Sequence, residues 1–134
     1  MTSGATDLPK VGHVLRYVYL FAAEAAKGRE EGIKERFVVV VGVRDRRYLV
    51  AAITTKGEGR PNAVALPPPV ARAGGVSPDS SVVVDEYNVF TWPGFDIRPL
   101  MSGQGFIAGR LTPSFTDKII TELVSRKAKP IERD

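Results

Sequence analysis

The sequence predicts a mainly β protein, a small curled sheet or barrel that one amphipathic helix caps near the C-terminus. Short runs rich in β-branched and aromatic residues recur along the chain, and glycine and proline separate them. A helical spacing of apolar residues follows Thr112. Many short strands with one terminal helix are typical of a sheet that curls around a single core.

The strands are expected where β-branched residues dominate. Residues 11–21 form the first strand, and the continuous apolar run at 36–43 indicates a buried central strand. The charged residues 44–47 turn the chain, so that residues 48–54 return as the partner strand of a hairpin. Shorter strands are expected at 63–66, 80–86, 88–92 and 106–111.

Two helical segments are expected in the second half of the chain. The prolines at 67–69 lead into a helical turn at 70–73 that two glycines end. A longer helix begins at Pro113, because proline suits the first helical position, and it runs to about Arg126. Spacings of three and four residues give this helix one apolar face, formed by Phe115, Ile119, Ile120 and Leu123.

The length of 134 residues is typical of one domain with one core. We expect that domain at 10–126, after a flexible N-terminus at 1–9 and before a flexible basic tail at 127–134, which Pro130 interrupts. No stretch is long and apolar enough to span a membrane, and the N-terminus lacks the apolar run of a signal peptide. The sequence therefore predicts a cytoplasmic protein.

Cysteine and histidine limit the possible chemistry. The chain has no cysteine, which excludes disulfides, thiolate metal sites and a cysteine nucleophile. Its one histidine is His13, so a histidine-rich zinc site and any histidine pair are excluded. We interpret His13 as a structural residue of the first strand, and we expect neither a metal nor a cofactor.

The charge of the chain is compatible with a polyanionic partner. The formal net charge is +4 and the sequence pI is about 9.6. Two interpretations stay open for the basic residues that gather in one stretch: they form a solvated hairpin edge, or they form a surface that meets phosphates. These residues are Arg44, Arg46, Arg47, Lys56 and Arg60.

Three stretches occur in the order and spacing of a known motif set. Residues 11–15 (VGHVL) are similar to an opening Gly-Asp-Val strand, and residues 28–40 look like a Gly-x-Glu-Gln-Gly loop that leads through Arg-Pro into an apolar strand. Residues 50–55 are similar to a strand that ends in Ile-Thr. With weaker similarities at 81–86 and 109–111, the chain resembles the MazF/PemK/Kid family of bacterial toxins over about residues 10 to 125.

This resemblance implies a small SH3-like β-barrel with a C-terminal helix, assembled as a homodimer. It also implies the activity of a type II toxin–antitoxin system, in which the toxin is a metal-independent endoribonuclease that cleaves single-stranded RNA. The expected partners are therefore single-stranded RNA, a second copy of the chain and a cognate antitoxin protein.

The residues themselves suggest how such cleavage would work. Without a histidine pair or a metal cluster, the RNA's own 2′-hydroxyl has to act as the nucleophile. Arg36 is the expected stabiliser of phosphate charge, because its guanidinium is always ionised and matches two phosphate oxygens. Thr54 is expected to bind phosphate or to orient Arg36. The alternatives are an arginine paired with Glu30, Glu31 or Glu35 and an ordinary threonine at a strand end.

The base and the acid are less defined, and Glu30, Glu31, Asp85 and Glu86 are the available carboxylates. Glu86 corresponds best to the acidic position of the family, so it completes the expected catalytic set with Arg36 and Thr54. Arg29 can stabilise charge, but its pKa is too high for an acid. The expected substrate-binding residues are Arg29, Glu30, Glu31, Thr55 and Lys56.

A second interpretation keeps the same fold without the cleavage. In it, the chain is a non-catalytic RNA- or protein-binding module. Phe37 stands where the family has proline, Val84 stands where some members have a basic residue, and Arg29 replaces a histidine of some members. Phe90 and Trp92 are able to stack on bases, although we favour core or dimer contacts for both.

Overall fold

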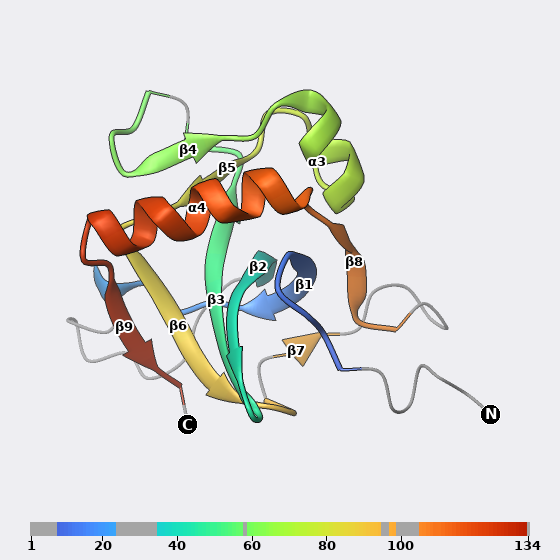
Figure 1. Ribbon diagram of the computed structural model, residues 1–134, viewed down its shortest axis with the longest axis vertical. Helices are drawn as coiled ribbons and strands as arrows, with labels where there is room; N and C mark the ends of the chain where they lie inside the picture. The colour runs from blue at the N-terminus through green and yellow to red at the C-terminus, as the bar shows by residue number, and fades with distance from the viewer. Residues whose placement is uncertain (1–7, 24–34, 58, 95–96, 99–104, 134) are drawn as a thin grey trace.

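The computed structural model describes residues 8–23, 35–57, 59–94, 97–98 and 105–133, which form one sheet and two helices (Figure 1). The prediction of a mainly β protein with a C-terminal helix is confirmed. The strands are β1 (His13–Val18), β2 (Glu35–Arg44), β3 (Arg47–Thr54), β4 (Ala63–Ala65), β5 (Ser81–Val83), β6 (Glu86–Thr91), β7 (Ile97–Arg98), β8 (Ile107–Arg110) and β9 (Lys129–Glu132). The helices are α3 (Pro68–Gly74) and α4 (Pro113–Ser125).

The centre of the sheet is the antiparallel trio β1–β2–β3. β3 is a branch point, because its first half pairs with β6 while Ile53 and Thr54 pair with β5. β4 extends β5, β9 extends β6 in parallel, and β7 and β8 share the free edge of β1. Within the described part of the chain this is an open nine-stranded sheet. Closure into an SH3-like barrel stays a prediction.

β2 separates two apolar clusters. Val38 and Val40 pack on one side with Tyr17, while Val39 and Val41 pack on the other side beneath α4. This double burial explains the continuous apolar run, since neither face of the strand meets water. Between Val40 and Gly42 the register with β3 shifts, and such a bulge bends a strand.

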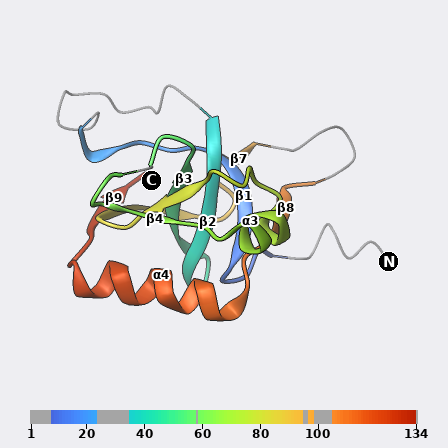
Figure 2. The ribbon, with the colours of Figure 1, turned by 90° about the horizontal axis from the view of Figure 1, so that it is seen from above.

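α4 lies across one face of the sheet (Figure 2). It begins at Pro113 and ends at Ser125, close to the expected limits. Phe115, Ile119 and Leu123 are buried against the sheet, while Ile120 is only half-buried at the side of the helix. The predicted apolar face of this helix is therefore confirmed.

The chain crosses from one half of β3 to the other at Val84 and Asp85. The run expected as one strand at 80–86 divides there, because Ser81–Val83 forms β5 and Glu86 already begins β6. Glu86 is therefore the first residue of a strand and not the last. This change of strand sets the environment of Glu86 in the candidate site.

Both ends of the domain extend beyond the expected limits. The tail was expected to be flexible, yet Lys129–Glu132 forms β9 and pairs with β6. Pro130 is tolerated because β9 lies at the edge of the sheet. At the N-terminus, Pro9 is buried and its carbonyl accepts a hydrogen bond from the Tyr48 hydroxyl (2.7 Å), whereas residues 1–7 lie outside the described residues. Among the described residues, no helix is long and apolar enough to cross a membrane.

The packing of α4 leads to a stability prediction. We expect Ile119→Ala to lower the free energy of unfolding by about 2–5 kcal/mol, because it leaves a cavity at a fully buried position. Urea denaturation followed by circular dichroism measures the change. The control is Val124→Ala on the same helix, where the side chain is 72% exposed and the expected change is within about 0.5 kcal/mol. Equal losses in both variants would contradict the observed orientation of the helix.

Candidate functional site

Arg36 lies near the start of β2, directly opposite Tyr17 in β1. Its side chain is half-buried, and the guanidinium carbon lies 4.7 Å from the centre of the Phe21 ring. The Nε atom is buried and has no hydrogen-bond acceptor among the described residues. Contact with an aromatic ring restricts the position of a guanidinium, and its remaining N–H groups suit an anion.

Of the three glutamates that were alternatives as ion-pair partners of Arg36, Glu35 is not its partner. Glu35 binds Arg16 of the neighbouring strand β1 (2.5 Å) and Arg98 of β7, the strand beyond β1 (3.6 Å). It also lies one residue along β2, and therefore on the opposite face from Arg36. Three predicted site residues lie outside the described residues: Arg29, Glu30 and Glu31.

Thr54 closes β3 on the same side of the sheet as Arg36. The ladder between β2 and β3 ends at Val38 and Ala52, so Arg36 and Thr54 each lie two residues beyond its last pair and are not paired with one another. Alternation along each strand directs both side chains to the face of that last pair. However, Thr54 pairs with Ser81 of β5, and its Oγ1 accepts the Lys56 N–H (3.0 Å). The threonine hydroxyl thus shapes the turn after β3 and keeps its own proton to donate.

Thr55 and Lys56 follow Thr54 and are both exposed. They belong to the basic stretch that was expected to meet phosphates or to form a solvated edge. β3 separates the two halves of that stretch by roughly 23 Å, since a strand rises about 3.3 Å per residue. Arg47, at the far end, forms an ion pair with Glu132. The basic residues from 44 to 60 therefore do not form one continuous patch.

Glu86 lies at the start of β6 and holds the chain that follows β1. Its Oε2 accepts hydrogen bonds from the Tyr19 hydroxyl (3.1 Å) and the Ala22 N–H (3.0 Å). Burial, and then the nearby Glu86 carboxylate, raise the pKa of Tyr19 far above its ordinary value. One oxygen of the predicted catalytic carboxylate thus already accepts two hydrogen bonds from the protein itself.

Arg36 and Glu86 are linked through residues to which the sequence assigned no role. The rings of Tyr19 and Phe21 lie 4.8 Å apart, with Glu86 at the hydroxyl of one and Arg36 over the face of the other. The sequence feature that could have drawn attention to Tyr19 and Phe21 is the alternation of aromatic residues at 17, 19 and 21. It predicted a strand, whereas β1 ends at Val18.

No match to this chain is found among models of protein families or among curated proteins. The resemblance to MazF/PemK/Kid toxins therefore rests on the quoted motifs alone.

The remaining sequence candidates are structural. Phe90 is buried and stacks between Tyr17 (5.0 Å) and Tyr48 (5.7 Å), which confirms a core role. Trp92 packs at the edge of the same aromatic group. His13 accepts the Lys10 N–H through Nδ1 (2.8 Å), and burial, with the charges of Arg110 and Lys10, lowers its pKa. This contact supports the structural interpretation of His13, which stays a prediction.

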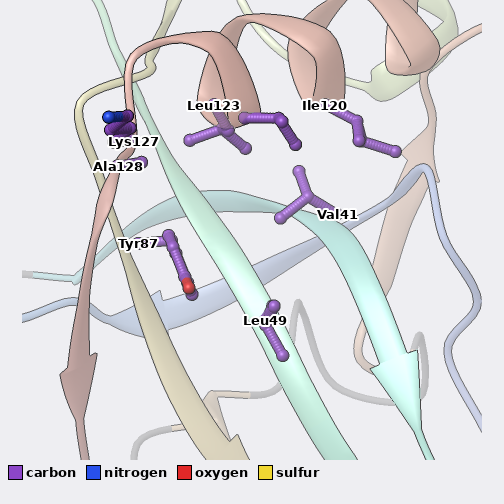
Figure 3. Close-up of a pocket in the computed structure, with 8 residues that line it drawn as sticks. Val41, Leu49, Tyr87, Ile120, Leu123, Lys127 and Ala128 are labelled. Carbon is purple, nitrogen blue, oxygen red and sulfur yellow. The ribbon is translucent and has the colours of Figure 1, made fainter.

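An apolar pocket of about 220 Å³ lies on the opposite face, beneath the C-terminal half of α4 (Figure 3). Ile120 and Leu123 extend from the helix toward Val41 and Tyr87 of the sheet. The residues predicted for RNA cleavage do not line it. Its lining residues are Val41, Leu49, Tyr87, Ile120, Leu123, Val124, Lys127 and Ala128.

The environment of Tyr19 predicts a loss of stability at high pH. Its raised pKa means that the unfolded chain loses the phenolic proton first, so the stabilisation is complete at neutral pH and declines above about pH 10. Urea denaturation at several pH values measures this slope. We expect Tyr19→Phe to have a shallower slope than the wild type, and an unchanged slope would contradict the burial of this hydroxyl beside Glu86.

Proposed function

We propose that this protein is the toxin of a type II toxin–antitoxin system, a cytoplasmic endoribonuclease that cleaves single-stranded RNA without a metal. The proposal includes an SH3-like barrel that forms a homodimer. The observation that supports it best is the guanidinium of Arg36, held on the Phe21 ring with a buried Nε that lacks an acceptor among the described residues. The β2–β3 register adds the Thr54 hydroxyl at the same end of the sheet.

In the proposed reaction the 2′-hydroxyl oxygen attacks the adjacent phosphorus, and the bond from phosphorus to the 5′-oxygen breaks. The products are a 2′,3′-cyclic phosphate and a 5′-hydroxyl. Arg36 donates N–H groups to the non-bridging oxygens, whose negative charge grows in the transition state. The Thr54 hydroxyl donates a hydrogen bond to the same phosphate.

Two protons move in this reaction: a base accepts the 2′-hydroxyl proton, and an acid supplies one to the departing 5′-oxygen. Glu86 is poorly suited to be the base, because its Oε2 already accepts two hydrogen bonds from the protein. Glu30 and Glu31 are the better candidates. Both carboxylates precede Arg36 by five or six positions in the sequence, in a segment outside the described residues.

The second candidate function is a binding module that does not cleave RNA. The pocket beneath α4 favours this function in its protein-binding form, because its lining is largely aliphatic and one lining residue, Val124, is 72% exposed.

The cleavage test uses purified protein and end-labelled single-stranded RNA in the presence of a chelator. We expect cut RNA with 2′,3′-cyclic phosphate ends, and no cutting of a substrate whose 2′-hydroxyls are methylated. Arg36→Ala should lower the rate at least about 100-fold, as the loss of one preorganised donor does in other enzymes. Arg72→Ala, on the exposed side of α3, should retain the wild-type rate.

Two results would decide against the nuclease. RNA binding without any cleavage by the wild type would favour the binding module. Cleavage that persists in Arg36→Ala would show that Arg36 does not take part in the reaction, even if the wild type is an active nuclease.

A further inference from the structure

Asn88 is a polar residue in the middle of an apolar core. It is fully buried in β6, opposite Val50 of β3. Its side-chain amide pairs with the backbone of Leu20, where Oδ1 accepts the N–H (2.9 Å) and Nδ2 donates to the carbonyl (2.8 Å). The side chain thus satisfies both polar groups of a residue that lies beyond the end of β1.

Glu86 extends the same attachment. It precedes Asn88 by two residues in β6, so both side chains leave the strand on one face. Together they hold the chain at three points, which are the Tyr19 hydroxyl, the Leu20 backbone and the Ala22 N–H. In both ribbon views the blue chain beyond β1 runs toward the side of the molecule that carries β6 and β9 (Figure 1, Figure 2).

The attached segment, residues 19–22, carries Phe21 to the Arg36 guanidinium. The Phe21 ring has Tyr19 on one side at 4.8 Å and the Arg36 guanidinium at 4.7 Å. A guanidinium over a ring face keeps its N–H groups directed outward in the plane, where phosphate oxygens can meet them. Contact with the ring therefore restricts where the Arg36 guanidinium lies.

We propose that Asn88 and Glu86 are positioning residues, which hold residues 19–22 so that Phe21 orients Arg36 for phosphate. This inference rests on the proposed function and deepens it. In this role Glu86 accepts hydrogen bonds and transfers no proton. Asn88, Tyr19 and Phe21 become part of the site. A buried asparagine here is explained by its two backbone hydrogen bonds, which an apolar residue of similar size cannot make.

The two possible roles of Glu86 predict different results for a conservative variant. Glutamine keeps an oxygen that accepts the Tyr19 and Ala22 hydrogen bonds, but it cannot take up a proton as a base. We expect Glu86→Ala to lower the cleavage rate about 10–100-fold through misplacement of Arg36, and Glu86→Gln to restore most of that loss. A Glu86→Gln variant as slow as Arg36→Ala would overturn the positioning role.

Asn88 is tested with Asn88→Ala and with the matched control Asn62→Ala, an asparagine whose side chain binds Asp85 instead. We expect kcat to fall about 10–100-fold in Asn88→Ala and to stay unchanged in Asn62→Ala. Phe21→Leu removes the ring and retains every donor and acceptor of the Asn88 and Glu86 hydrogen bonds, so it serves if Asn88→Ala does not fold. Combined with Arg36→Ala, Phe21→Leu should add no further loss, whereas additive losses would contradict the linkage.

A readout independent of cleavage separates this inference from the proposed function. Amide hydrogen exchange of Leu20 and Ala22 should accelerate at least about 10-fold in Asn88→Ala, while Val39 in the central strand stays protected. The NMR signal of the Arg36 Nε–H should shift in Phe21→Leu, because the ring current is lost. An inactive wild type that shows both changes would overturn the nuclease alone, and unchanged exchange with an unshifted signal would overturn the positioning role.

Discussion

The burial of β2 on both faces is the constraint on which the rest of the structure depends. Four successive valines, Val38 to Val41, alternate between two apolar clusters, and each cluster needs its own cover. α4 covers one face, and the aromatic group of Tyr17, Tyr48 and Phe90 fills the other. Burial of a valine side chain contributes about 1.5–3 kcal/mol, so any arrangement that exposes one face of β2 is strongly disfavoured.

This constraint also determines where Arg36 emerges. The strand register is closely specified, since a slip by one residue would move Arg36 to the opposite face and into the wrong cluster. Arg36 precedes the buried run by two residues, so its backbone is still paired with β1 while its side chain leaves the core. A rigid backbone with a partly solvated guanidinium is the arrangement that a preorganised anion site requires.

The polar interactions of the fold differ in their importance. The ion pairs of Arg16 with Glu35 and of Arg126 with Glu122 are partly exposed, and such pairs contribute little to stability. The hydrogen bonds of Asn88 are buried, and the loss of either partner would leave a buried donor and a buried acceptor without hydrogen bonds. The specific path of residues 19–22 therefore depends on Asn88 and Glu86 more than on the surface charges. The apolar pocket lies on the other face, so the surfaces proposed for RNA and for a protein partner are separated by the sheet.

The sequence by itself determined the local elements. The hairpin around residues 44–47 and the helix that begins at Pro113 were predicted with limits close to those observed, because apolar periodicity, turn residues and capping signals report local structure. Only the tertiary structure decided what Glu86 contacts, that Asn88 holds Leu20, and that the tail after Arg126 becomes β9. These contacts join residues more than 60 positions apart in the sequence at Glu86 and Asn88, or depend on a free sheet edge at β9. Periodicity shows that a side chain is buried, but the partner that it meets depends on how the whole chain packs.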